Sequence, residues 1–306
     1  MATRFEMVLH GEDAVALRAA GEEAISEIER LEEQLSLYRP SSEIAALNYR
    51  AARAPVRVTP PLFALLQHAQ QLSQETDGAF DITIGPLVRC WGFMGGSGRL
   101  PSDEELAQAR AIVGMDLVHL DAKNFTVRFA REGVTIDLGA IGKGYAIDRA
   151  TEVLRDAGIT SGLVHGGTST VYALGHPPDA EYWKVAVENP PASVTARSPP
   201  LPPVPLQDEA MSVSAIWGRS FEKEGQIFGH VLDPRTGNPA AKAVLAAVIL
   251  PSATETDALS TALLTLGSKG HDKIAKLRPG MRTFLVLGAN QQFRVETRNM
   301  SAANLG

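Results

Sequence analysis

The chain has 306 residues, of which 29 are Lys or Arg and 35 are Asp or Glu, and its formal net charge is −6. This balance argues against a nucleic-acid-binding protein, which needs a basic surface. The one cysteine, Cys90, excludes a disulfide framework within the chain and any multi-cysteine metal site. The length suits one or two domains with a full hydrophobic core.

No membrane or export segment is evident in the sequence. The longest apolar run, residues 243–250, is far shorter than the roughly 18 residues that a membrane helix needs. The first fifteen residues lack the charged, apolar and small-residue parts of a secretory signal. We therefore expect a cytoplasmic protein, or an exported one if the true start lies upstream of Met1.

The first half of the chain is dominated by helical patterns. Apolar residues recur at spacings of three and four after residue 12, Ser42 is a typical helix cap, and Pro60-Pro61 opens a further helix. The expected elements are a strand at 4–9, a helix at 12–37, a short helix from Ser42, a helix after Thr59, an extended turn at 78–83 and a helix at 103–113.

The second half is dominated by short strand patterns. Strands are expected at 117–120, 126–129, 134–136, 163–165, 171–174, 184–187, 211–214, 228–232 and 244–250, a hairpin at 283–287 with 292–296, and helices at 143–157 and 256–266. Helices and strands do not alternate regularly, which favours an α+β fold of mixed sheets and helices over a doubly wound sheet. Seven prolines at 189–205 predict a Pro-rich surface loop inserted in a single domain, 1–306.

Residues 134–145 read as a strand, a glycine-rich turn and the start of a helix. Such a turn lets a backbone approach a phosphate at the helix N-terminus, and Lys143 would add positive charge. The spacing matches neither the P-loop nor the dinucleotide-binding motif. From this segment alone, tight packing is an equally good interpretation.

Residues 229–239 contain a histidine followed by a turn. His230 is a candidate acid or base, and Arg235 is a candidate phosphate ligand. The alternative is a structural turn in which Asp233 accepts hydrogen bonds from its own backbone.

Residues 255–262 place a carboxylate and a hydroxyl on one helix face. Asp257 and Thr261 are four residues apart, with Ser260 beside them, and such hard oxygen ligands suit Mg²⁺. The alternative is that Thr256 or Asp257 caps the helix.

Two further fragments, 36–43 and 78–81, contain aromatic residues. Tyr38 is placed to stack on a planar ring and Asp81 to accept hydrogen bonds, but Tyr38 and Phe80 also fit a hydrophobic core.

Taken in order, these segments resemble the ApbE family, the FAD:protein FMN transferases. The fragments that carry the resemblance are Met1-Ala2-Thr3, Leu37-Tyr38-Arg39, 78–87, Trp91-Gly92-Phe93, 137–146, 230–237 and 257–262. Each fragment is weakly specific alone, whereas the ordered set spans most of the chain. The fold implied is a single ApbE-like, T-fold-like domain.

The resemblance implies an enzyme that uses Mg²⁺ and FAD. It would transfer FMN to a Thr or Ser hydroxyl of a target flavoprotein and release AMP. The roles implied are His230 as acid–base catalyst, Met1, Tyr38, Ala79, Phe80, Asp81, Asp137, Lys143 and Leu232 as FAD contacts, and Ala140, Asp257 and Thr261 as metal ligands.

Three fragments depart from the family pattern. Alanine replaces glycine at Ala2, threonine replaces aspartate at Thr168 in the turn 165–168, and residues 214–217 replace a Ser-Gly-Asp-Tyr-like turn. Two alternatives therefore stay open: an FAD pyrophosphatase that yields FMN and AMP, and a non-catalytic FAD-binding protein.

Overall fold

A computed structural model describes residues 3–190, 201–223, 225–289 and 292–300. The chain forms two compact units. The first unit consists of Met1–Glu32, Ile141–Ala215 and Lys242–Gly306, and the second of Glu33–Ala140 and Ile216–Ala241. The Pro-rich segment 189–205 belongs to the first unit, and its residues 191–200 lie outside the described residues.

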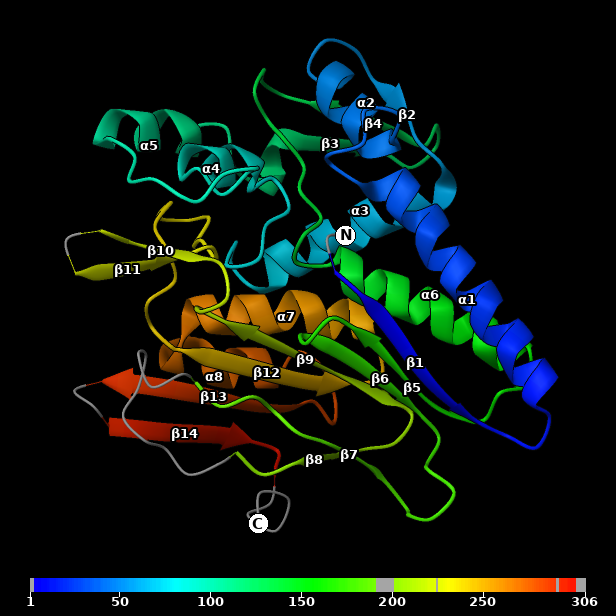
Figure 1. The fold of residues 1–306 in the computed structure, drawn as a ribbon. Coiled ribbons are helices and arrows are strands. Elements are labelled where there is room, and N and C mark those ends of the chain that lie inside the picture. The colour runs from blue at the N-terminus through cyan, green and yellow to red at the C-terminus, as the bar shows by residue number, and fades with distance from the viewer. Residues whose placement is uncertain (1–2, 191–200, 224, 290–291, 301–306) are drawn as a thin grey trace. The chain divides into compact units, whose positions relative to one another are not determined.

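The first unit is built on a seven-stranded sheet in which every neighbouring pair is antiparallel (Figure 1). In spatial order the strands are β1 (Phe5–His10), β5 (Ser161–Gly166), β6 (Thr170–Leu174), β9 (Glu209–Ala215), β12 (Leu245–Leu250), β13 (Arg282–Ala289) and β14 (Gln292–Arg298). Every residue of β6 and β12 is buried, so the core runs along the middle of the sheet. The antiparallel order confirms the α+β prediction.

Two helices of the first unit carry candidate site residues. They are α6 (Gly142–Asp156) and α7 (Ala253–Leu266), which pack against each other and against the sheet (Figure 1). The described part of the first unit also contains helix α8 (Ser268–Ala275), most of helix α1 (Ala14–Leu35), and a small hairpin of β7 (Trp183–Val185) and β8 (Val204–Leu206). The last turn of α1 belongs to the second unit.

Apart from the 16-residue helix α3 (Pro60–Glu75), the second unit consists of short elements. Its other helices are α2 (Glu43–Arg50), α4 (Gly85–Cys90), α5 (Asp103–Arg110) and the 3₁₀ turn η1 (Met115–Leu117). Its strands are β2 (Val56–Arg57), β4 (Thr126–Phe129) and β3 (Val118–Asp121) in one sheet, and β10 (Ser220–Lys223) with β11 (Gln226–Gly229) in a hairpin. The predicted cap at Ser42 is confirmed, because its side chain accepts a hydrogen bond from the Ala45 amide at 2.9 Å.

The structure corrects several expected strands. Residues 134–136 form only an isolated bridge at Thr135, because the backbone of Ile136 bonds to the Asn48 side chain at 2.8 and 2.9 Å instead of to a strand. The strand expected at 228–232 ends at Gly229. The Pro-rich loop was expected to lack ladder bonds, but part of it forms β8, in which Pro205 lies opposite Lys184. Helices α4 and α8 were not predicted.

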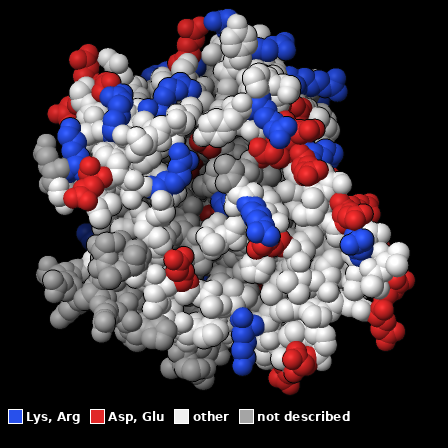
Figure 2. Space-filling view, viewed as in Figure 1, with Lys and Arg blue, Asp and Glu red and all other residues white. Residues whose placement is uncertain are grey.

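The visible surface shows no concentration of basic side chains. Figure 2 shows Lys and Arg interspersed with Asp and Glu over the described residues of that face. Among the helices of the described ranges, none is long and apolar enough to cross a membrane.

Candidate functional site

The N-terminal ends of α6 and α7 meet closely within the first unit. A Cβ atom at Gly144 would lie 2.0 Å from the Ala253 carbonyl oxygen, so only glycine allows this approach. The Gly144 amide donates a hydrogen bond to Asp257 Oδ2 at 3.1 Å. The glycine-rich turn therefore serves packing, and it also brings a helix-terminal N–H to a carboxylate.

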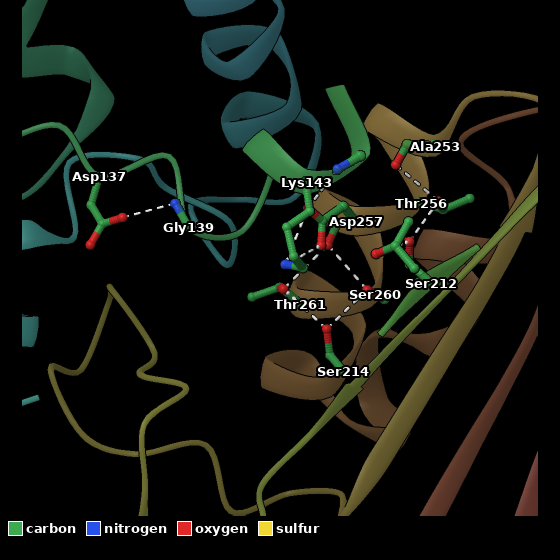
Figure 3. A network of polar contacts seen from close by, with 12 residues as sticks. Asp137, Gly139, Lys143, Ser212, Ser214, Ala253, Thr256, Asp257, Ser260 and Thr261 are labelled. Atoms are coloured by element: carbon green, nitrogen blue, oxygen red, sulfur yellow. Dashed lines mark hydrogen bonds and ion pairs between the residues drawn. The ribbon is translucent and has the colours of Figure 1, made fainter. Parts of the chain in front are cut away.

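Asp257 is the charged centre of this junction. Asp257 is 4% exposed, and Lys143 Nζ lies 3.2 Å from its Oδ1 and 3.5 Å from its Oδ2 (Figure 3). The hypothesis that Thr256 or Asp257 caps the helix is wrong, because Ser252 is the cap and accepts from the Glu255 amide. Asp257 lies inside α7, which leaves its carboxylate to face Lys143.

Three hydroxyl groups lie close to Asp257 and bond to one another or to its backbone carbonyl. Ser214 Oγ, at the end of β9, lies 2.9 Å from Ser260 Oγ and 3.1 Å from Thr261 Oγ1 (Figure 3). The Ser260 and Thr261 hydroxyls both donate to the Asp257 backbone carbonyl, at 3.1 and 3.3 Å. In the described ranges no three His, Cys, Asp or Glu side chains gather in a metal-binding arrangement. A cation here would therefore depend on one carboxylate with neutral oxygen donors.

His230 directly follows β11 in the second unit. Its amide and its ring Nδ1 each lie 3.0 Å from the Arg219 carbonyl oxygen. The turn behind it is held by Asp233, which accepts from the Arg235 amide at 3.0 Å and from two guanidinium nitrogens at 2.8 Å. The structural-turn interpretation of Asp233 is thus confirmed. The Arg235 side chain, a candidate phosphate ligand, pairs with Asp233.

The aromatic fragments of the second unit differ in exposure. Tyr38 is 62% exposed, so the core interpretation is wrong for this ring. Ala79 and Phe80 are 1% and 2% exposed, so the core interpretation holds for Phe80. Leu232 packs in a buried cluster that includes Trp91.

Asp81 is a buried carboxylate with several donors. Oδ1 accepts from the Thr83 amide and hydroxyl at 2.8 and 2.6 Å, and Oδ2 accepts from the Met115 amide at 3.0 Å. Burial raises the pKa of Asp81 above its ordinary value, and the Thr83 and Met115 hydrogen bonds oppose this rise. Asp81 also lines a cavity of about 420 Å³, together with Gly78 and Arg235.

Two comparisons, with a family model and with curated proteins, show what this chain is similar to. The ApbE family model matches residues 1–285. The chain belongs to the ApbE family. A FAD:protein FMN transferase of Vibrio cholerae is 33% identical over 247 residues, which cover 79% of this chain and 72% of that protein. One of Treponema pallidum is 31% identical over 291 residues, covering 89% and 78%.

Solved ApbE structures share the fold. The apo flavinyl transferase ApbE of Pseudomonas stutzeri matches with a TM-score of 0.81 at 29% identity, covering 96% of this chain and 95% of that one. The ApbE protein of Thermotoga maritima matches with a TM-score of 0.83 at 28% identity and covers 96% of both chains. The ApbE-like fold expected from sequence is thereby confirmed.

The residues expected from the ApbE resemblance fall into separate groups. Lys143, Asp257 and Thr261 belong to one polar network of the first unit. The second unit contains Tyr38, Ala79, Phe80, Asp81, Asp137, Ala140, His230 and Leu232. Asp137 Oδ1 accepts from the Gly139 amide at 2.8 Å and so shapes the turn that ends at Ala140. Met1 lies outside the described residues.

Sequence reasoning missed two features of the polar network around Asp257. Ser214 stood out only as part of an altered turn, yet its hydroxyl joins the network around Thr261. The pairing of Lys143 with Asp257 joins residues 114 positions apart, and no local pattern indicates it. Of the other two departures, Thr168 is an exposed turn residue between β5 and β6, and Ala2 lies outside the described residues.

Proposed function

We propose that this chain is a FAD:protein FMN transferase that modifies a Thr or Ser hydroxyl of a flavoprotein and releases AMP. One observation supports this most: the buried Asp257 carboxylate on α7 pairs with Lys143, and three hydroxyls bond to one another and to the backbone carbonyl of the same residue. That arrangement occurs in a chain of the ApbE family, whose curated relatives are named for this activity. Phosphoryl transfer needs this kind of positioning and charge neutralisation more than it needs a covalent intermediate.

The reaction balances as a single displacement at phosphorus. The acceptor hydroxyl oxygen forms a bond to the phosphorus of the FMN half of FAD. The anhydride bond to the AMP half breaks, and AMP leaves with the bridging oxygen. The hydroxyl proton passes to Nε2 of His230, whose Nδ1 is engaged with the Arg219 carbonyl.

The residues of the first unit fit a magnesium ion by their chemistry. Carboxylate, hydroxyl and carbonyl oxygens are the ligands that Mg²⁺ prefers, and Asp257 and Thr261 supply the first two kinds. We propose that these two residues and the Ala140 carbonyl hold the ion. When bound, the ion neutralises charge on the pyrophosphate. Lys143, already beside Asp257, adds a second positive charge.

The FAD contacts that we propose are those that the family resemblance implies. The exposed Tyr38 ring is available for stacking on a flavin or adenine ring. We also propose Ala79, Phe80 and Leu232 as FAD contacts, as the family resemblance implies. Asp81, Asp137 and Lys143 would contribute polar groups, and Met1 a further contact.

Product analysis tests the proposal. The protein is incubated with FAD and MgCl₂, with and without a flavin-acceptor domain, and parallel samples contain EDTA. The proposal predicts AMP in a one-to-one ratio with covalently bound flavin, only when the acceptor and Mg²⁺ are present. FMN and AMP formed without an acceptor would instead establish a pyrophosphatase. FAD left intact beside two different acceptor domains would indicate a binding protein.

A further inference from the structure

The imidazole of His230 is held in one tautomer by the backbone of Arg219. Nδ1 lies 3.0 Å from the Arg219 carbonyl oxygen, and a carbonyl oxygen only accepts hydrogen bonds. Nδ1 must therefore carry the proton. In the neutral ring Nε2 then has the lone pair, which is the form that a base needs.

The register of the hairpin explains why these two residues meet. Strands β10 and β11 pair antiparallel with Ser220 opposite Gly229, so Arg219 and His230 are the next residues in register. The His230 amide also donates to the Arg219 carbonyl at 3.0 Å. A Cβ atom at Gly229 would lie 2.6 Å from the Ile216 carbonyl oxygen, so the chain before the histidine is closely packed.

The Arg219 side chain fixes the position of this carbonyl. Its Nη2 donates to the Phe93 carbonyl oxygen at 2.8 Å, and Phe93 is 3% exposed in the buried cluster around Trp91. The hairpin is attached to the same cluster through Phe221 and Phe228, which stack with ring centroids 5.2 Å apart. The guanidinium thus links a partly exposed histidine segment to a rigid core.

We propose that Arg219 is a positioning residue for His230, acting through its own carbonyl oxygen and anchored at Phe93. This inference rests on the proposed function, in which His230 takes the acceptor proton. Without the anchor, the carbonyl shifts and the ring samples the other tautomer. Because displacing a general base weakens proton transfer, we expect kcat of Arg219→Ala to fall about tenfold, while KM for FAD stays unchanged.

The test combines spectroscopy with kinetics. Protein containing ¹⁵N-labelled histidine is examined by NMR at high pH, and His230→Ala identifies the signal among the seven histidines. The wild type should show the Nδ1–H form, and Arg219→Ala a mixture of both tautomers. Arg219→Lys, which retains one donor, should restore most of kcat. The acid limb of the pH–rate profile should shift only in Arg219→Ala.

Arg131→Ala is the matched control, because Arg131 Nη1 also donates to a backbone carbonyl of the second unit, that of Ala111, at 3.1 Å. It should leave the tautomer and kcat unchanged. An Nε2–H form in the wild type, or an unaltered tautomer and kcat in Arg219→Ala, would overturn the inference. If the wild type transfers no flavin, the proposed function fails. The tautomer measurement still decides whether Arg219 fixes the His230 ring.

Discussion

The two units present their chemical groups in different settings. In the first unit, Asp257 and Thr261 project from α7, a helix whose core-facing residues are buried, and they bond to groups on α6 and β9. In the second unit, His230 lies in an irregular segment after a two-stranded hairpin, and its amide and its ring both lie against the Arg219 backbone carbonyl. Helix-borne groups are fixed by many contacts, whereas the loop-borne histidine depends on a few.

This difference separates two kinds of mutational effect. Removal of a helix-borne carboxylate takes away charge at a fixed place. Removal of the loop-borne ring should take away the proposed proton acceptor while the surrounding fold stays intact. Variants of both kinds of group test that distinction, and those with the largest expected effect come first.

Asp257→Ala should lower Mg²⁺-dependent flavin transfer by at least about a hundredfold, because the only carboxylate proposed to bind the ion is lost. Steady-state rates across a MgCl₂ titration measure this. Asp272→Ala is the control, since Asp272 is a carboxylate of the same unit that pairs with Arg298. Unchanged turnover in Asp257→Ala would remove the α7 network from the reaction.

His230→Ala should lower kcat about a hundredfold, because general-base catalysis is lost, and should leave FAD affinity largely intact. Stopped-flow flavin transfer and FAD fluorescence titration measure the two quantities. His119→Ala, at an exposed position on β3, is the control. A rate equal to wild type from pH 6 to 9 would exclude His230 as the base.

Asp148→Ala should reduce stability while catalysis persists. The Asp148 carboxylate accepts hydrogen bonds from the Ala253 and Thr254 amides at 2.7 and 2.9 Å, and so supplements the Ser252 cap at the start of α7. Loss of such a cap costs about 1–2 kcal/mol, which urea denaturation would detect. If instead kcat collapses while stability is kept, the division between cap and catalytic network is wrong.

Mild acidification should lower stability through His271. Burial lowers the pKa of this histidine below its ordinary value of 6.5, so the unfolded chain binds the proton more readily. The unfolding free energy should therefore fall as the pH drops below 6.5, and level off below the folded-state value. Urea midpoints between pH 7.5 and 5.0 test this, and His271→Gln should flatten the dependence.

A second carboxylate titrates in a separate pH range. Hydrogen bonds from Ser268 lower the pKa of Glu296 below its ordinary value of 4.5. Its contribution to stability is therefore present above pH 4.5 and lost as the pH falls further. A decline confined to pH below 4.5 would assign the effect to Glu296 and contradict the role of His271.

Local patterns predicted the helix-borne groups well. The spacing of Asp257 and Thr261 placed both on one helix, and the glycine-rich turn led into α6 as expected. The start of α7 was misjudged, because Ser252 lies four residues ahead of Thr256 and competes better as a cap. The short helices α4 and α8 were missed, since six or eight residues carry little periodic signal.

Contacts between distant residues were beyond local reasoning. The bonds that replace a strand at residues 134–136 come from Asn48, 88 positions away, and the anchor of Arg219 is at Phe93, 126 positions away. Local reasoning offered His230 and Tyr38 only as candidates beside structural alternatives, and the family resemblance implied their roles, because a lone histidine or tyrosine has no distinctive spacing. Resemblance did not reveal the Arg219 carbonyl, whose role depends on hairpin register.

The most direct test of the central claim is the intact mass of a flavin-acceptor domain after incubation with this protein, FAD and MgCl₂. The account predicts a gain equal to one FMN moiety, absent with EDTA, with Asp257→Ala, and with an acceptor whose hydroxyl has been removed. An acceptor of unchanged mass, in a sample where FAD has been split into free FMN and AMP, would contradict it.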